Sequence, residues 1–163
     1  MKEIKDAHRQ WIEAKANAAR KEESIGNFEL AEKLDACNMF TGNESLEDLV
    51  ALMFTPQGIE FLTHLGGGFP DLSVFRKFKR FSPDRSGIYI DCGEITLSNP
   101  ENAFLVGNTI ASIHYDELKS KRLVMMHGAK ASVEASGWAV VKIDTDGTCD
   151  VDVKKCDHAK VLQ

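Results

Sequence analysis

The sequence predicts an α+β protein in which a helical segment over residues 1–86 precedes an all-β domain over residues 87–163. Three observations lead to this prediction. Apolar residues recur at helical spacing up to about residue 86 and alternate with polar residues after it. A weak repeat of about 20 residues runs through the second part, where Gly107, Gly128 and Gly147 mark turns. Hydrophobic residues make up 43% of the 163 residues, which is enough to build a core.

The chain begins with a predicted helix from Lys2 to about Arg20. Its thin apolar stripe consists of Ile4, His8, Trp11, Ile12, Lys15 and Ala19. Gly26-Asn27 interrupts the helical pattern, and a second helix is expected from Phe28 to Cys37. Two helices joined by so short a connection predict an αα-hairpin.

Three shorter helices are expected before the β domain. Ser45 and Asp48 have the spacing of a capping box, which predicts a helix over residues 46–53. Thr55-Pro56 is a typical helix start, and that helix is expected to end at the glycines 66–68. A last short helix is expected over residues 72–78, and the turn-rich residues 82–87 form a linker.

Nine short strands are predicted after Gly87, each bounded by turn residues. They are Ile88–Asp91, Glu94–Leu97, Ala103–Val106, Thr109–Tyr115, Arg122–His127, Ala129–Ala135, Trp138–Asp144, Thr148–Lys154 and His158–Leu162.

Two β architectures fit these strands. The segments 105–113 and 125–133 align with each other, as the stacked rungs of a β-solenoid with about 20 residues per rung would. Small residues such as Ala111 and Ala131 suit its narrow interior. The alternative is a small antiparallel β-sandwich or meander, which hairpin-type turns at Asp146-Gly147 and Ser136-Gly137 favour.

Charge and composition exclude several classes of function. The chain carries 20 basic and 25 acidic residues, a net charge of −5, which argues against non-specific nucleic-acid binding. No apolar run reaches about 18 residues, so we expect no contact with a membrane. The charged residues at the N-terminus do not form a signal peptide, so we expect a cytoplasmic protein. Its cysteines, expected to be free thiols, are Cys37, Cys92, Cys149 and Cys156.

The densest charged segment combines basic and aromatic residues. It contains Arg76, Lys77, Phe78, Lys79, Arg80 and Phe81. Such interleaving occurs in sites that bind nucleotides or nucleic acids. Leu72, Phe75 and Phe78 also have the spacing of a buried helical stripe, and the basic side chains would then face the acidic helices that precede them. We favour this structural interpretation.

An aspartate cluster offers the only pattern for a metal site. Asp144, Asp146, Asp150 and Asp152 lie close together in the sequence, and a cation site or an acid–base pair would also draw on His127. Asp144-Thr145-Asp146-Gly147 does not match a calcium-binding EF-hand loop, because the first and last ligand positions would be Lys142 and Val153. Other possible ligands, His114, His158, Cys149 and Cys156, lack the spacing of a zinc site. We therefore expect a hairpin turn and a solvated strand face, with no cofactor and no catalytic residue.

Several strings in the chain resemble a family of small uncharacterised bacterial proteins. They are residues 55–61, 69–72, 87–91, 126–129 and 135–141, and the resemblance covers about residues 46–162. It implies a protein carried on prophages or other mobile elements, with an accessory or anti-defence role. No functional residue follows from it.

We therefore expect a non-enzymatic protein-binding module, such as an immunity, inhibitor or anti-defence factor. Its partner is a second protein or another copy of the chain, and Trp11 and Trp138 are further candidate contact residues. One alternative is nucleotide or nucleic-acid binding through residues 72–81. A second is metal-assisted hydrolysis by the aspartates of residues 144–152.

Overall fold

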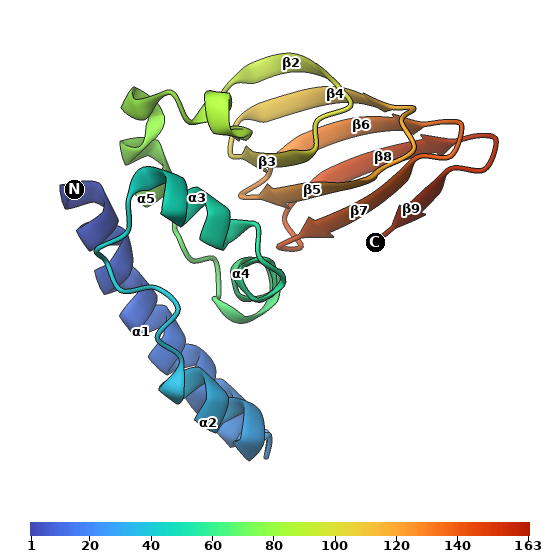
Figure 1. Cartoon of the computed structure of the whole chain (residues 1–163). Coiled ribbons are helices and arrows are strands. Elements are labelled where there is room, and N and C mark those ends of the chain that lie inside the picture. The colour runs from blue at the N-terminus through green and yellow to red at the C-terminus, as the bar shows by residue number, and fades with distance from the viewer. The chain divides into compact units, whose positions relative to one another are not determined.

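The computed structural model describes residues 1–163 and confirms that helices are followed by a β domain (Figure 1). Contacts divide the chain into two units, Met1–Lys77 and Phe78–Gln163. This boundary lies earlier than residue 86, because the 3₁₀ turn Pro83–Ser86 contacts the first strand and belongs to the β unit.

The first unit contains five α-helices and a π-helical turn. They are α1 (Lys2–Ser24), α2 (Phe28–Ala36), α3 (Leu46–Met53), α4 (Pro56–Glu60), the π turn Phe61–Leu65 and α5 (Leu72–Lys77). The helices α1 and α2 contact each other along the expected hairpin. The Oγ of Ser45 accepts a hydrogen bond from the Asp48 N–H at 3.1 Å, and the Oγ1 of Thr55 caps α4 in the same way at 3.0 Å. Both predicted helix starts are confirmed.

The buried face of α1 differs from the predicted stripe. Ile4, Ala7, Trp11 and Ala18 are buried, whereas Ile12 is 49% exposed. Alanine side chains are small, so neighbouring segments can pack closely against them. The face of α1 that carries the alanines is therefore the buried one, and Ile12 lies outside it.

The second unit is a β-solenoid, as the 20-residue repeat predicts. Its strands are β1 (Ile88–Ile90), β2 (Gly93–Ser98), β3 (Asn102–Val106), β4 (Thr109–Tyr115), β5 (Ser120–Met126), β6 (Lys130–Ala135), β7 (Val140–Thr145), β8 (Asp150–Lys155) and β9 (Lys160–Leu162). One sheet has the order β1-β3-β5-β7-β9 and the other β2-β4-β6-β8, and every pair is parallel. The alternative of an antiparallel sandwich or meander is therefore wrong.

The strand register confirms the predicted alignment of rungs. Leu105 pairs with Met125 on β3 and β5, and Ile113 pairs with Val133 on β4 and β6. The residues that turn the chain between the sheets are only partly as expected. The residue after the Val106–Met126 pair is Gly107 in one rung and His127 in the next, and both have positive φ. His127, rather than Gly128, is thus the counterpart of Gly107.

The hairpin turns predicted at two glycines are also wrong. Asp146-Gly147 connects β7 to β8, and Ser136-Gly137 connects β6 to β7, so each joins strands of different sheets. Both glycines have positive φ, as they would in a hairpin, which explains why the two turn types look alike in a sequence.

The core of the β unit lies between its two sheets. Alanines alternate there with larger apolar side chains, among them Leu105, Ile113, Tyr115 and Met125. The opposite face of the five-stranded sheet is apolar as well, and its buried side chains are Ile88, Ile90, Phe104, Val106, Val124 and Met126. This sheet is therefore apolar on both faces over β1, β3 and β5, as a parallel sheet commonly is.

Substitution of Gly147 tests whether the corners of the solenoid need a residue with positive φ. Its φ is +85°, and a Cβ atom there would meet nothing within 4 Å, so a substitution adds backbone strain alone. We expect Gly147→Ala to lower the free energy of unfolding by about 1 kcal/mol or more. Gly147→Asn is the matched control, since Asn tolerates this conformation better and should cost less. Urea denaturation measures both, and equal stability of the wild type and Gly147→Ala would contradict the assigned corner.

Substitutions of Tyr115 test how the interior of the solenoid is packed. Its side chain is fully buried, its hydroxyl has no hydrogen-bond partner, and burial raises the pKa of the phenol. An unsatisfied polar group destabilises a core, so we expect Tyr115→Phe to raise the free energy of unfolding by about 1 kcal/mol. Tyr115→Ala should instead lower it by about 3 kcal/mol or more, because it opens a cavity. A clear loss of stability in Tyr115→Phe, measured by the same denaturation, would show that the hydroxyl is bonded.

Candidate functional site

The aspartate cluster does not assemble into a metal site. Asp144 projects from the outer face of the five-stranded sheet beside Lys142, and Asp150 from the outer face of the four-stranded sheet. Asp146 lies between them at a corner and accepts hydrogen bonds from the N–H groups of His127 (2.9 Å) and Thr148 (3.0 Å). No three His, Cys, Asp or Glu residues of the chain are grouped so that they could hold a metal ion.

Asp146 has a structural role at this corner. Partial burial raises the pKa of its carboxyl group, but the hydrogen bonds from Thr148 and His127 outweigh burial, so its pKa is lower than usual. The carboxylate thus stays ionised and ties two successive rungs together. In the first rung, Asp91 likewise accepts a hydrogen bond from the Asn108 N–H of the next rung, at 2.8 Å.

The basic side chains of residues 76–80 have partners within the protein. The Nζ of Lys77 is 3.2 Å from the Oδ2 of Asp6 on α1, and that hydrogen bond is the main cause of the lowered pKa of Asp6. The Nζ of Lys79 donates to the Asp91 carbonyl at 3.3 Å, and the Arg80 guanidinium lies over the Phe81 ring at 4.9 Å.

The aromatic residues of this segment do not form a platform for bases. Phe75 and Phe78 are buried, in line with the amphipathic stripe, and Phe81 is partly buried. The arrangement favours the structural interpretation of the segment over a nucleic-acid site, because stacking on bases needs accessible rings.

The two tryptophans lie in opposite environments. Trp11 is only 4% exposed and packs against the rings of His8, Phe40 and Phe61. Trp11 therefore lies in the core of the helical unit rather than on its surface. Trp138 is 60% exposed and stacks on the His158 ring, with centroids 4.0 Å apart and planes at 13°.

Trp138 belongs to a column of side chains at one edge of the solenoid. Ser120, Val140 and Lys160 pair across β5, β7 and β9. Two residues before each of them stand Leu118, Trp138 and His158, so these three residues have equivalent positions in the sequences of successive rungs. The loop of Leu118 differs in backbone conformation from the other two, in which Gly137 and Asp157 have positive φ. We call these three residues, with the neighbouring acids Glu117 and Asp157, the corner surface.

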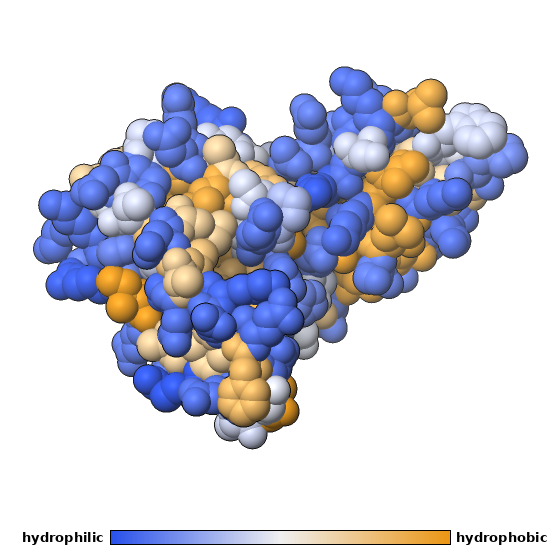
Figure 2. Space-filling model, turned by 60° about the horizontal axis from the view of Figure 1, so that its bottom comes forward, coloured by the Kyte–Doolittle hydropathy of each residue, from blue (hydrophilic) through white to orange (hydrophobic).

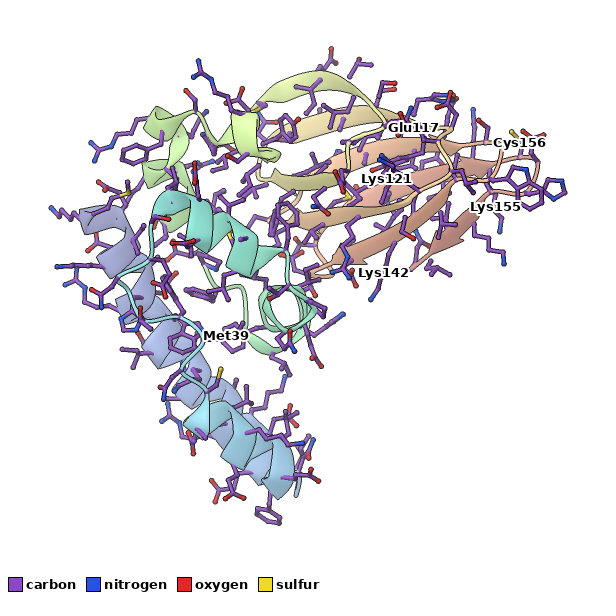
Figure 3. The ribbon with its side chains drawn as sticks, viewed as in Figure 1. Met39, Glu117, Lys121, Lys142, Lys155 and Cys156 are labelled. Atoms are coloured by element: carbon purple, nitrogen blue, oxygen red, sulfur yellow. The ribbon has the colours of Figure 1, made fainter.

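Hydrogen bonds and an ion pair fix the loops that carry the corner surface. Lys121 is only 4% exposed, and its Nζ donates to the Asn99 carbonyl at 3.3 Å and pairs with Glu117 at 2.9 Å. The Oδ2 of Asp157 accepts from the Gly137 N–H at 3.0 Å. Figure 3 shows Glu117 and Lys121 on this edge, together with Cys156. The exposed rings and aliphatic groups therefore stand on a rigid support.

Exposed charges of both signs flank the column in the sequence: the acids Asp116 and Asp157, and the lysines Lys119, Lys155 and Lys160, while Glu117 is paired with Lys121. The hydrogen bond from Asn99 is the main cause of the lowered pKa of Asp116. The surface can thus bury aliphatic and aromatic groups of a partner between charges of both signs.

The outer face of the four-stranded sheet is a second surface of the β unit. It forms a shallow groove of about 770 Å³, in which Thr96, Ser112, Ser132 and Asp152 make a central row. Ile110, 44% exposed, is its only exposed large apolar side chain. On the side that Figure 2 presents, hydrophilic side chains cover much of the surface, and hydrophobic side chains gather in patches, one of them over the β unit.

Sequence reasoning selected Trp138 but missed Leu118 and His158. The signal was present, since the three residues are spaced by 20, but only the parallel register shows that they share one edge.

No protein-family model matches the chain, and no curated protein and no solved structure matches it either. None of its helices has the length and apolar character needed to cross a membrane.

The contrast between the tryptophans predicts a simple spectroscopic result. In Trp11→Phe the remaining Trp138 should emit at long wavelength and be quenched readily by iodide, because it is exposed to water. In Trp138→Phe the remaining Trp11 should emit at shorter wavelength and resist quenching. Fluorescence titration with iodide measures both, and equal accessibility of the two tryptophans would contradict the exposed corner surface.

Proposed function

We propose that this protein is a non-enzymatic protein-binding module that contacts its partner through the corner surface. The observation that carries the proposal is the exposed Trp138, stacked on His158 and aligned with Leu118, which is 77% exposed. Exposed tryptophan is costly in water and is enriched among the residues that dominate protein interfaces.

The rigidity of the corner supports binding. Stacking on His158 restricts the Trp138 ring before a partner arrives, and the bonds of Lys121 and Asp157 hold the loops. A side chain that is already ordered loses less conformational entropy on binding, so more of the burial energy contributes to affinity.

The charges indicate what kind of partner surface fits. Exposed charges of both signs flank the column, so a partner with an apolar centre and a rim of mixed charge fits it. An Arg or Lys of that partner gains further if it lies over the face of the Trp138 ring. In the wider biological context we propose an immunity, inhibitor or anti-defence factor of a bacterial mobile element, which rests on the resemblance of residues 46–162 alone.

Affinity capture with matched variants tests the proposal. The baits are the wild type, Trp138→Ala, Trp138→Phe and the control Ile110→Ala, which removes an exposed apolar side chain from another face of the same unit. Because a tryptophan at the centre of an interface typically contributes about 2 kcal/mol or more, Trp138→Ala should weaken binding about 30-fold. Trp138→Phe should retain part of the affinity, and Ile110→Ala nearly all of it.

Binding is quantified by titrating the purified captured protein, and native mass spectrometry detects self-association. A partner, or a second copy, that is lost with Trp138→Ala alone supports the proposal. Equal binding by all four baits would refute the use of this surface. A protein that binds neither a partner nor itself would refute the function.

A further inference from the structure

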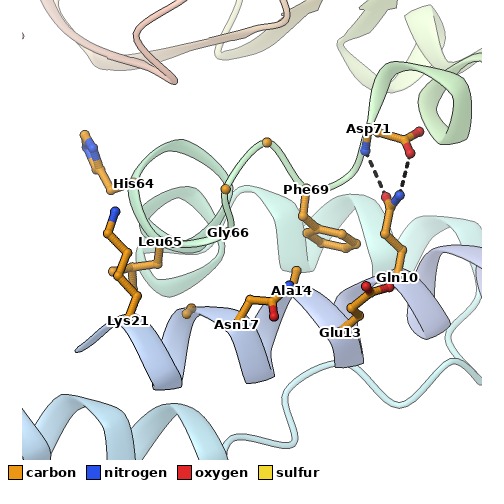
Figure 4. A pocket seen from close by; sticks show the side chains of 13 residues that line it. Gln10, Glu13, Ala14, Asn17, Lys21, His64, Leu65, Gly66, Phe69 and Asp71 are labelled. Atoms are coloured by element: carbon orange, nitrogen blue, oxygen red, sulfur yellow. Dashed lines mark hydrogen bonds between the residues drawn. The ribbon is translucent and has the colours of Figure 1, made fainter. Parts of the chain in front are cut away.

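The helical unit contains a groove that is separate from the corner surface. It lies between α1 and the segment that runs from the π-helical turn to Asp71, and it has a volume of about 350 Å³ (Figure 4). This is within the size range of small-molecule sites. Two hydrogen bonds join the two sides of the groove at one end. The Gln10 side chain on α1 accepts from the Asp71 N–H at 2.9 Å and donates to the Asp71 carboxylate at 2.5 Å.

Opposite charges lie at the two ends of the groove. Glu13 and Lys21 stand on the same side of α1, with Asn17 between them. Figure 4 shows Lys21 and His64 directed toward each other at one end and Glu13 near Gln10 at the other. The side chains of Glu13, Lys21 and His64 make no hydrogen bond and no ion pair within the chain. The groove is therefore lined by charged groups that have no internal partner.

The middle of the groove leaves room for a main chain. Its floor is formed by the small residues Ala14 and Ala18, with Phe69 beside them. Gly67 and Gly68 have φ of +59° and +88°, and a Cβ atom on either would meet nothing within 4 Å, so the backbone itself faces open space. A ligand can approach such a backbone more closely than it can approach side chains.

We propose that this groove binds a short peptide with free termini, its ammonium group near Glu13 and its carboxylate between Lys21 and His64. Glu13 and Lys21 are eight positions apart on α1, which corresponds to a rise of about 12 Å. An extended tripeptide spans roughly 10 Å, so its two terminal charges reach the two ends. The amide of Asn17 lies beside the peptide's own amides, and the alanine floor favours small side chains.

Calorimetric titration of the full chain with trialanine tests the proposal. Comparison ligands are N-acetyl-trialanine, which lacks the ammonium group, and trialanine amide, which lacks the carboxylate. We expect saturable binding with a dissociation constant of about 1 mM or lower, and about tenfold weaker binding of each blocked peptide. Acetate and inorganic phosphate serve as probes for a site that accepts any anion.

Charge variants locate the two ends. Glu13→Gln should remove the preference for trialanine over its acetylated form and leave the preference over the amide intact. Lys21→Met should do the reverse, and the control Lys5→Met, an exposed lysine of α1 outside the groove, should change neither preference. These crossed effects separate direct contact from a general change in fold, which circular dichroism also monitors.

Three results would overturn the proposal. One is the absence of saturable binding of any peptide at about 10 mM, roughly ten times the expected dissociation constant. Another is equal binding of trialanine and its blocked forms. The third is binding of phosphate or acetate as tight as that of trialanine, which would leave only an anion site at Lys21 and His64. None of them bears on the corner surface, which belongs to the other unit.

Discussion

The parallel pairing of strands one rung apart is the constraint on which the β unit depends. Neighbouring rungs are offset by 16 residues at the start of the solenoid and by 20 after that. Each rung must leave one sheet, turn and enter the other in register with its neighbours, so the turn positions must adopt the left-handed conformation. Gly107, His127 and Gly147 satisfy this need with different side chains. Asp91 and Asp146 then accept hydrogen bonds from the next or previous rung, which couples each corner to its neighbour.

The same constraint creates the corner surface. Because neighbouring rungs repeat at about 4.8 Å, a residue type that recurs every 20 positions becomes a column on the exterior. On the inside such columns pack into the core. At the edge between sheets there is no partner sheet, so Leu118, Trp138 and His158 remain in contact with water. The periodicity that stabilises the fold thus also brings the proposed binding residues together at this edge.

Much of the fold could be predicted from the sequence because local signals dominate there. All nine strands and both helix caps were evident from alternation and from Ser45 and Thr55. The choice between parallel and antiparallel pairing was harder, because positive-φ glycines such as Gly147 are needed in both turn types. The left-handed position at His127 was not evident, since glycine is the residue that usually occupies such a position and Gly128 stands next to it.

The sites were less predictable, because they depend on which side chains end up facing one another. Trp11 looks like a surface tryptophan on a charged helix, yet Phe40 and Phe61 bury it. Three aspartates that are close in the sequence project in different directions, because the chain changes sheets at Asp146. Conversely, the groove of the helical unit joins Glu13 and Lys21 to residues about fifty positions away, and no local pattern indicates such a pairing.

The most direct test of this account is whether residues that lie 20 positions apart are neighbours in solution. Nuclear Overhauser effects measured on the full chain should connect the side chains of Ile113 and Val133 in the interior, and the rings of Trp138 and His158 at the corner. Both contacts together would establish the stacked rungs and the column they carry. Their absence, with contacts between antiparallel neighbours in their place, would contradict the solenoid and the binding surface derived from it.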